Sequence, residues 1–316
     1  MRDAEAELRA AKRPLVLGMG GGGDVVGALA TAEFSRIYDG TDPILGGLAW
    51  ERRPIDPVPG PRSSSEIEGA DRVAPGVLLA GPGTRARGRE MYFAESRMAQ
   101  FLNQPILLVD VLGGPGAIAT GLAQAVDRLG CDLVVLIDVG GDVLAQGGEP
   151  GLRSPLCDAV MLAAGVRLGK AGHPVLAGIF GIGCDAELTP PEVMAQLAVV
   201  AGAAGLCGAR GLTDPVASRL EDAIALVPTE ASAQAVLAFR GGSGIRTIRR
   251  SRRTLELTSM AAVTIYLDPE VVMRTSARLA RAVADADSLE DANRALHDLG
   301  VRTELDLERE APGIRA

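Results

Sequence analysis

The sequence predicts a doubly wound α/β fold, in which a mostly parallel sheet of Rossmann-like βα units is covered by helices on both faces. Three observations support this prediction. A strand, a glycine-rich turn and a helix follow one another near the N-terminus, later apolar runs are continuous rather than alternating, and helical patterns separate these runs. We expect one domain over residues 1–316, with an irregular C-terminal extension from about residue 240 to 316.

The first βα unit begins with PLVLGMGGGGDVVG at residues 14–27. Leu15–Leu17 form the apolar run of a strand, the glycines follow, and the helical pattern of Val25–Ile37 begins directly after Asp24. Glycine permits the tight turn, and the free N–H groups and dipole of a helix N-terminus favour an anion. The unit therefore predicts a ligand at the carboxyl end of the first strand.

The other elements alternate along the chain. Apolar runs predict buried strands at Ile44–Leu48, Val77–Ala80, Ile106–Val109, Leu133–Ile137, Val175–Ile179 and Ala262–Leu267, with a weaker candidate at Ala223–Val227. Helical spacing and helix-start signals predict helices at Arg87–Leu102, Ala117–Leu129, Pro155–Leu168, Pro191–Gly205, Pro269–Ala284 and Leu289–Leu299. This alternation is typical of a doubly wound sheet.

Two segments interrupt the alternation. Arg52–Pro75 is rich in proline, serine and charge, and is too long for an ordinary α/β connection, which predicts a functional or mobile loop. Arg240–Arg253 holds most of the local positive charge around a Gly-Gly-Ser-Gly turn. Its arginines can bind a phosphate or carboxylate, although the interleaved apolar residues favour an amphipathic surface strand.

Composition narrows the class of protein. The net charge of −8 and a pI near 5.0 disfavour nucleic acid as a partner. No apolar run approaches the length of a membrane span, so we expect no membrane partner. The four cysteines are far apart and form no CxxC pair, which fits a reducing cytoplasm. We expect a small-molecule ligand, and a homo-oligomer is compatible with the sequence.

The glycine loop has three competing interpretations. Gly20, Gly21, Gly22 and Gly23 can donate backbone N–H groups to an anion, or they can only allow tight packing of helix on strand. A dinucleotide site is the third interpretation, but it needs an acid at the end of the second strand, and the acids near that distance, Asp39 and Asp42, precede that strand.

Acidic residues follow several predicted strands, where an open α/β sheet binds its ligand. They are Asp24, Asp110, Asp138, Asp142, Asp185 and Glu187. Three or more convergent carboxylates favour Mg²⁺ or Mn²⁺, or hold an amine or a sugar. The alternative is that each acid only caps a helix.

Two further features belong to the same predicted edge. Gly113 and Gly114 precede a helix and repeat the pattern of the first loop, as a second anion site or as a plain turn. Trp50 and Glu51 follow the second strand. Trp50 can stack on a ligand ring, and core packing is its alternative role.

The stretches GMGGGGDVVGALATAEF and ILGGLAWERRPIDPVPGPRS resemble the DUF1152 family of archaeal and bacterial proteins, over most of the chain. The resemblance implies a soluble α/β fold and carries no reaction. DVLGGPGAIATGLAQAV, which begins at Asp110, is more loosely similar to the DGPPGA segment of D-glutamate cyclase-type proteins, and no catalytic residue is carried over from it.

From these observations we expect an enzyme that acts on a small polar or phosphorylated metabolite by hydrolysis, group transfer or cyclisation. Asp24, Asp138 and Asp142 are the expected catalytic residues or ligands of Mg²⁺ or Mn²⁺. The expected substrate-binding residues are Gly20, Gly21, Gly22, Gly23, Trp50, Glu51, Asp110, Gly113, Gly114 and Asp185. The alternatives are a noncatalytic ligand-binding or regulatory protein and a nucleotide-binding oxidoreductase.

Overall fold

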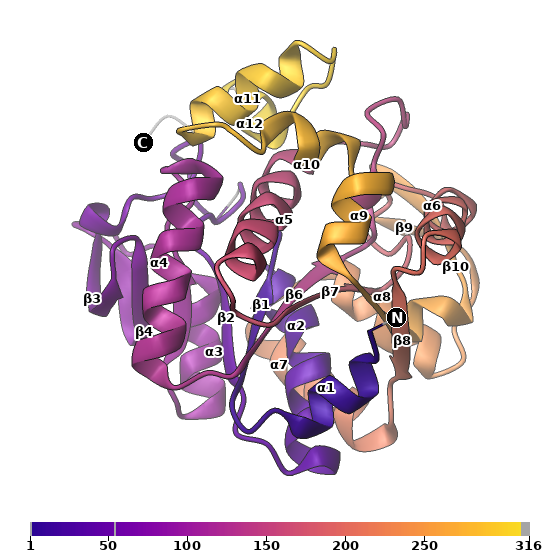
Figure 1. The fold of residues 1–316 in the computed structure, drawn as a ribbon, viewed down its shortest axis with the longest axis horizontal. Coiled ribbons are helices and arrows are strands. Elements are labelled where there is room, and N and C mark those ends of the chain that lie inside the picture. Colours follow the sequence, from indigo (N-terminus) through magenta and orange to yellow (C-terminus); the bar gives the residue numbers. More distant parts are fainter. Residues whose placement is uncertain (1, 54, 311–316) are drawn as a thin grey trace.

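The computed structural model describes residues 2–53 and 55–310 and has a mixed α/β architecture (Figure 1). Within this part of the chain, a nine-stranded sheet forms the centre. Across the sheet the strands are β3 (Ile67–Ala74), β4 (Val77–Ala86), β5 (Ile106–Val109), β2 (Ile44–Leu48), β1 (Pro14–Gly18), β6 (Leu133–Val139), β7 (Val175–Phe180), β11 (Val263–Leu267) and β8 (Leu206–Gly211).

The middle of the sheet is parallel and both edges are antiparallel. β5, β2, β1, β6 and β7 pair in parallel. β4 pairs antiparallel with β3 and β5, and β11 pairs antiparallel with β7 and β8. The mostly parallel α/β sheet predicted from the sequence is therefore confirmed, while two of the predicted strands, Val77–Ala80 and Ala262–Leu267, run antiparallel to their neighbours in the centre.

Helices cover both faces of this sheet, as the continuous apolar strands require. Alternate residues of β1 show the two cores, because Leu15 and Leu17 pack in one apolar cluster and Val16 packs in the other. One face carries α2 (Asp24–Phe34), α3 (Ala94–Leu102), α7 (Asp214–Leu226) and α8 (Glu230–Phe239). The opposite face, toward the viewer in Figure 1, carries α4 (Gly114–Leu129), α5 (Pro155–Lys170), α9 (Pro269–Thr275), α10 (Arg278–Val283) and α11 (Leu289–His297).

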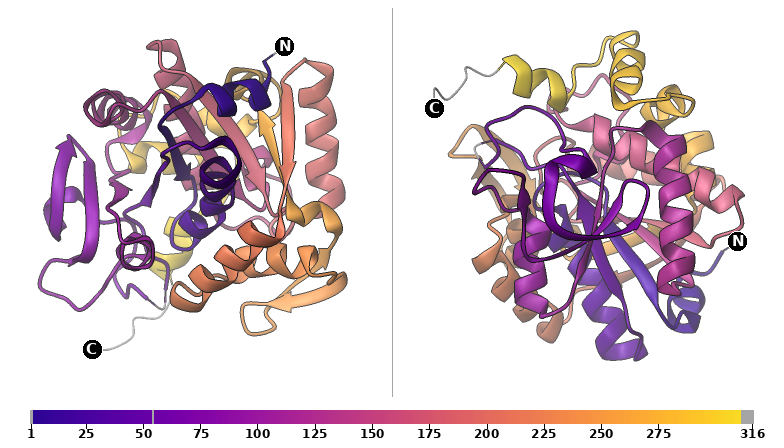
Figure 2. Two further views of the ribbon diagram at one scale, coloured as in Figure 1. Left: turned by 90° about the horizontal axis from the view of Figure 1, so that it is seen from below. Right: turned by 90° about the vertical axis from the view of Figure 1, so that its left-hand side faces the viewer.

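The remaining elements lie around these layers (Figure 2). They are α1 (Ala4–Ala10), the π-helical turn η1 (Ser35–Asp39), the 3₁₀ turns η2 (Ser64–Glu66), η3 (Asp142–Leu144) and η4 (Ser259–Ala262), α6 (Pro190–Gly202), the hairpin β9 (Gly244–Ile248)–β10 (Arg253–Leu257), and α12 (Glu304–Glu310). Among the helices formed by residues 2–53 and 55–310, none is both long and apolar enough to cross a membrane.

Three local predictions differ from the structure. Ala223–Val227 is the C-terminal end of α7 and the residue after it, not a strand, because Val216, Leu220 and Ala223 bury one face of a helix. The loop expected over Arg52–Pro75 contains η2 and the edge strand β3. The C-terminal segment is regular rather than irregular, since it contributes the hairpin, strand β11 and four helices to the described structure.

Candidate active site

The order of the strands determines where a ligand binds. β1 lies between β2 and β6, and the helices that follow β1 and β6 go to opposite faces of the sheet. A doubly wound sheet opens a crevice at such a switch point, beyond the carboxyl ends of the two strands. The glycine loop follows β1, and the segment Asp138–Asp142 includes the end of β6 and the residues directly after it. The topology therefore brings these two predicted segments to one place.

A cavity of about 820 Å³ lies at this crevice, a volume within the range of small-molecule sites. Six of the predicted residues on the glycine loop and after β2 line it, namely Gly20, Gly21, Gly22, Gly23, Asp24 and Glu51. Asp142 and Asp185 line it as well. The wall is completed by arginines and by acids that come from α5, the β9–β10 hairpin and α12.

The glycine loop is packed tightly, and two of its N–H groups already have partners. The Gly20 N–H donates to the Asp24 carboxylate at 3.1 Å, and the Gly22 N–H donates to the Trp50 carbonyl at 2.9 Å. A Cβ on Gly21 would lie 2.6 Å from the Trp50 carbonyl oxygen. These glycines therefore serve packing, and those two N–H groups are not available to an anion.

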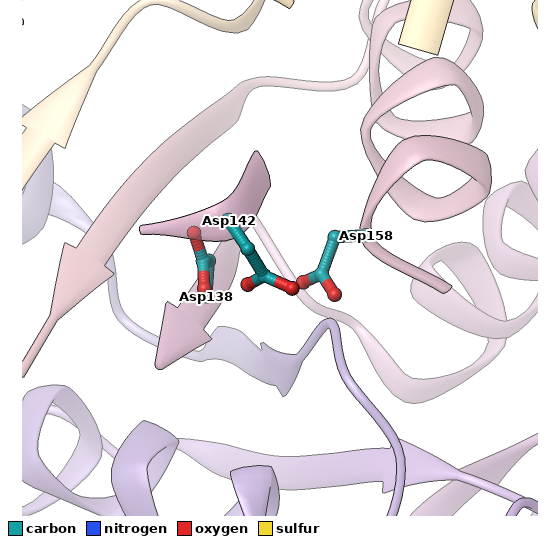
Figure 3. Close-up of side chains that lie close together, drawn as sticks. All are labelled: Asp138, Asp142 and Asp158. Atoms are coloured by element: carbon teal, nitrogen blue, oxygen red, sulfur yellow. The ribbon is translucent and has the colours of Figure 1, made fainter. Parts of the chain in front are cut away.

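Buried carboxylates gather at the cavity wall and beside it. Carboxylate oxygens of Asp138, Asp142 and Asp158 lie within 4.8 Å of one another, and so do those of Asp142, Asp185 and Glu187. Figure 3 shows the first group, in which the Asp142 and Asp158 carboxylates point toward each other. Asp142 belongs to both groups, so it is the centre of the cluster.

The cluster is buried and raises the pKa values of its own members. Burial raises the pKa of Asp142 well above its ordinary value, and the neighbouring Asp158 and Asp138 raise it further. The pKa of Asp24 is raised by burial and by Asp138. Within residues 2–53 and 55–310, Asp24, Asp138, Asp142, Asp158 and Asp185 form no ion pair with arginine or lysine. Such uncompensated acids are typical of functional sites.

Several arginines also line the cavity. Arg249, Arg250 and Arg252 come from the turn between β9 and β10, Arg253 is the first residue of β10, and Arg153 precedes α5. Arg249, Arg250 and Ser251 all have positive φ angles, a left-handed conformation that is costly for residues other than glycine. The strained turn holds several arginines at the cavity, and β10 beside it is the amphipathic surface strand that the sequence favoured, since it buries Leu255 and Leu257 and exposes Thr254 and Glu256. Arg240 and Arg246 do not line the cavity.

Several predicted site residues lie outside the cavity wall. The Trp50 side chain is fully buried, donates from Nε1 to Glu308, and supports the Arg52 guanidinium 4.4 Å from its ring centre. Asp110 accepts hydrogen bonds from the N–H groups of Ser64 and Leu112. Gly113 and Gly114 begin α4, and Gly114 packs against the backbone of residues 286–288. Asp138 lies behind Asp142 and accepts from the N–H groups of Gly141 and Val143.

Other residues of the site were not predicted. Asp158 lies in the first turn of α5, and Glu304 and Glu308 are one helical turn apart on α12. Glu304 accepts from the N–H groups of Leu156 and Cys157, which begin α5. The sequence holds a weak signal for Asp158, because SPLCD places an acid soon after a proline that starts a helix.

Glu51 lines the cavity from the segment that follows β2, and it does not belong to either of the two acidic groups. Its side chain is buried and accepts a hydrogen bond from the Ala94 N–H at the start of α3. Burial raises its pKa to about 7. Because the folded protein then holds a proton that the unfolded chain releases near pH 4.5, the stability of the fold decreases as the pH rises from 4.5 to 7.

We therefore expect Glu51→Gln to stabilise the protein above pH 7 by up to about 3 kcal/mol and to have little effect near pH 4. Glutamine carries no charge, and its side-chain oxygen still accepts from Ala94. Thermal unfolding at pH 4.5, 6 and 8 measures the difference. Glu90→Gln, at an exposed position, is the control. A stability difference that is the same at all three pH values would contradict the prediction.

Comparison with known proteins identifies a family. The family described as "Protein of unknown function (DUF1152)" matches residues 15–312. The chain belongs to the DUF1152 family. The DUF1152 match begins in β1 and ends beyond α12, so it includes every residue of the cavity wall. No curated protein and no solved structure matches the chain, and the looser similarity to D-glutamate cyclase-type proteins has no support from these comparisons.

Proposed function

We propose that the protein is an enzyme that acts on a small phosphorylated metabolite, by hydrolysis, group transfer or cyclisation, in the cavity at the carboxyl ends of β1 and β6. One observation carries the proposal: the same cavity is lined by several arginines and by buried carboxylates that pair with no arginine or lysine of the described residues, namely Asp142, Asp158 and Asp185. A phosphorylated molecule would place its anionic group against the arginines and its reacting part near the acids.

The arginines are the expected anion-binding groups. Arg249 and Arg253 lie 3.8 and 3.5 Å from the Glu187 carboxylate, which fixes their positions without neutralising the whole cluster of arginines. Guanidinium groups bind phosphate through paired hydrogen bonds. The glycine loop could donate to the ligand only those N–H groups that have no partner within the protein. Its main contribution would therefore be to the shape of the cavity rather than to anion binding.

The acids favour catalysis over binding alone. A protein that only binds an anion gains nothing from buried carboxylates close to the ligand, because they repel it. Acids with raised pKa values are suited to proton transfer near neutral pH. Asp24, Asp142 and Asp158 line the cavity, and they are the expected acid or base groups or metal ligands.

A nucleotide-binding oxidoreductase has less support from the same geometry. Asp39 pairs with Arg210 at 2.6 Å and Asp42 pairs with Arg13 at 3.4 Å, and neither lines the cavity. We also propose that the protein is located in the cytoplasm, because its four cysteines are free and buried.

The test uses inorganic pyrophosphate as a probe, followed by a panel of phosphorylated sugars, nucleosides and acids in a phosphate-release assay. We expect the wild type to bind pyrophosphate in calorimetry, and Arg253→Gln to bind it roughly 10- to 100-fold more weakly. Arg246→Gln is the matched control, because Arg246 lies on the same hairpin but outside the cavity wall.

Equal affinity in the wild type and in both variants would contradict the anion-binding role of the cavity. Binding of panel members without turnover, with Mg²⁺ or Mn²⁺ present, would favour the noncatalytic alternative over an enzyme.

A further inference from the structure

We propose that Asp138, Asp142 and Asp158 bind one divalent cation of the Mg²⁺ or Mn²⁺ class in the cavity. This inference deepens the proposed function and depends on it for the chemical role of the ion. The three side chains come from separate elements, since Asp138 lies in β6, Asp142 begins η3 and Asp158 lies in the first turn of α5. Their carboxylate oxygens nevertheless lie within 4.8 Å of one another (Figure 3).

Asp158 provides the observation that points to a bound cation. Its side chain is 3% exposed, and its Oδ1 has no hydrogen-bond partner among the described residues. The carboxylate points toward Asp142, which is another acid. Burying a carboxylate without a hydrogen-bond donor or a cation costs free energy, because the group loses its hydration. Coordination of a metal ion commonly compensates for this loss.

The neighbouring acids support the same arrangement. Asp138 accepts hydrogen bonds from the Gly141 N–H at 3.3 Å and from the Val143 N–H at 3.1 Å. These bonds fix the direction of its carboxylate, as outer contacts commonly fix the ligands of a metal. No arginine or lysine of the described residues pairs with any of the three acids, so no fixed cation competes for them.

The second acidic group is a weaker candidate, although it shares Asp142. Both oxygens of Glu187 are occupied, because they accept from the N–H groups of Arg153 and Ser154 and from the Ser154 hydroxyl. Arg249 and Arg253 also lie within 4 Å of this carboxylate. A metal ion there would have to compete with these two arginines, whereas no arginine or lysine of the described residues pairs with the first group.

The ligand set determines the class of ion. Three carboxylates without a histidine or a thiolate among them are hard oxygen ligands, which suit Mg²⁺ and Mn²⁺. Mg²⁺ commonly keeps several waters and completes its coordination with a phosphate of the substrate. Asp142 and Asp158 line the cavity, so an ion held by them would be open to a phosphorylated ligand.

The experiment measures binding of Mn²⁺ alone to chelator-treated full-length protein, by equilibrium dialysis and by the electron paramagnetic resonance signal of free Mn²⁺. We expect one ion per chain in the wild type. Asp158→Asn is expected to weaken binding about tenfold or more, since asparagine keeps the shape and removes the charge. Glu187→Gln distinguishes the second acidic group, and Asp110→Asn is a control at a strand end outside the cavity.

Retained affinity in Asp110→Asn and Glu187→Gln, together with the loss in Asp158→Asn, would support the site. Folding of each variant is checked by its melting temperature without metal. If Asp158→Asn fails to fold, Asp138→Asn provides the same test. No Mn²⁺ binding by the wild type at millimolar concentration would overturn the inference, and so would a loss confined to Glu187→Gln. Pyrophosphate binding measured without metal tests the proposed function separately, so the two failures can be told apart.

Discussion

Asp142→Asn is expected to weaken Mn²⁺ binding roughly 100-fold, more than any other single substitution in the acidic cluster. Asp142 is the only residue that belongs to both acidic groups of the described chain, and its carboxylate lies between those of Asp138 and Asp158. Its replacement therefore affects every arrangement of ligands that the cavity offers. Equilibrium dialysis with Mn²⁺ measures the loss, and the phosphate-release assay measures its effect on turnover once a substrate is known.

The same variant should keep its fold. Asparagine has nearly the shape of aspartate, and it removes one charge from a set of like charges, so the metal-free protein should melt no lower than the wild type. A variant that melts several degrees lower would show that Asp142 has a structural role. Affinity within threefold of the wild type would show that the ion lies elsewhere.

Arg52→Met is expected to destabilise the protein by about 3 kcal/mol, because it leaves two buried carboxylates without their cation. Arg52 follows β2, and its guanidinium lies 3.4 Å from Glu304 and 3.6 Å from Glu308 on α12. For a chain of this length the loss corresponds to a decrease of about 5 °C in melting temperature. Differential scanning calorimetry measures it directly.

A double-mutant cycle tests the cause. Glu304→Gln and Glu308→Gln together, in the Arg52→Met background, should restore part of the lost stability, because the carboxylates no longer carry charge. Arg302→Met is the surface control. Arg302 precedes α12 and pairs with Glu310 at the end of that helix, and both side chains are more than half exposed. If Arg52→Met and Arg302→Met have equal effects, the buried ion pairs do not stabilise α12.

The parallel centre of the sheet was predictable because the sequence of each strand is by itself typical of a buried strand. Leu133–Ile137 and Val175–Ile179 are apolar throughout, which is typical of strands that are buried on both faces. β3 was not predictable, because three of its eight residues are charged and it is an edge strand with one neighbour. Ala223–Val227 illustrates the opposite error, since a short apolar run does not distinguish a strand from the end of a helix.

The candidate site also contains residues that could be predicted from the sequence and residues that could not. Asp142 was predictable from the rule that ligands lie beyond the carboxyl ends of strands. Asp158 and Glu304 reach the cavity only through the packing of α5 and α12, and no local pattern encodes that packing. Trp50 was expected beside a ligand, yet its ring supports Arg52 from behind. A single tryptophan after a strand therefore indicates the neighbourhood of the site without giving the direction of the ring.

The bonds from the start of α5 to Glu304 also affect how the protein is made. Leu156 and Glu304 are separated by 148 positions in the chain, and ribosomes produce the N-terminal residue of such a pair first. At ordinary rates of translation, α5 waits on the order of 10 s for its partner on α12. A product of interrupted translation would contain the five parallel strands and the acidic cluster, but one wall of the cavity would be absent. Synthesis of nearly the whole chain is thus a condition for an intact site, which keeps incomplete products from carrying it.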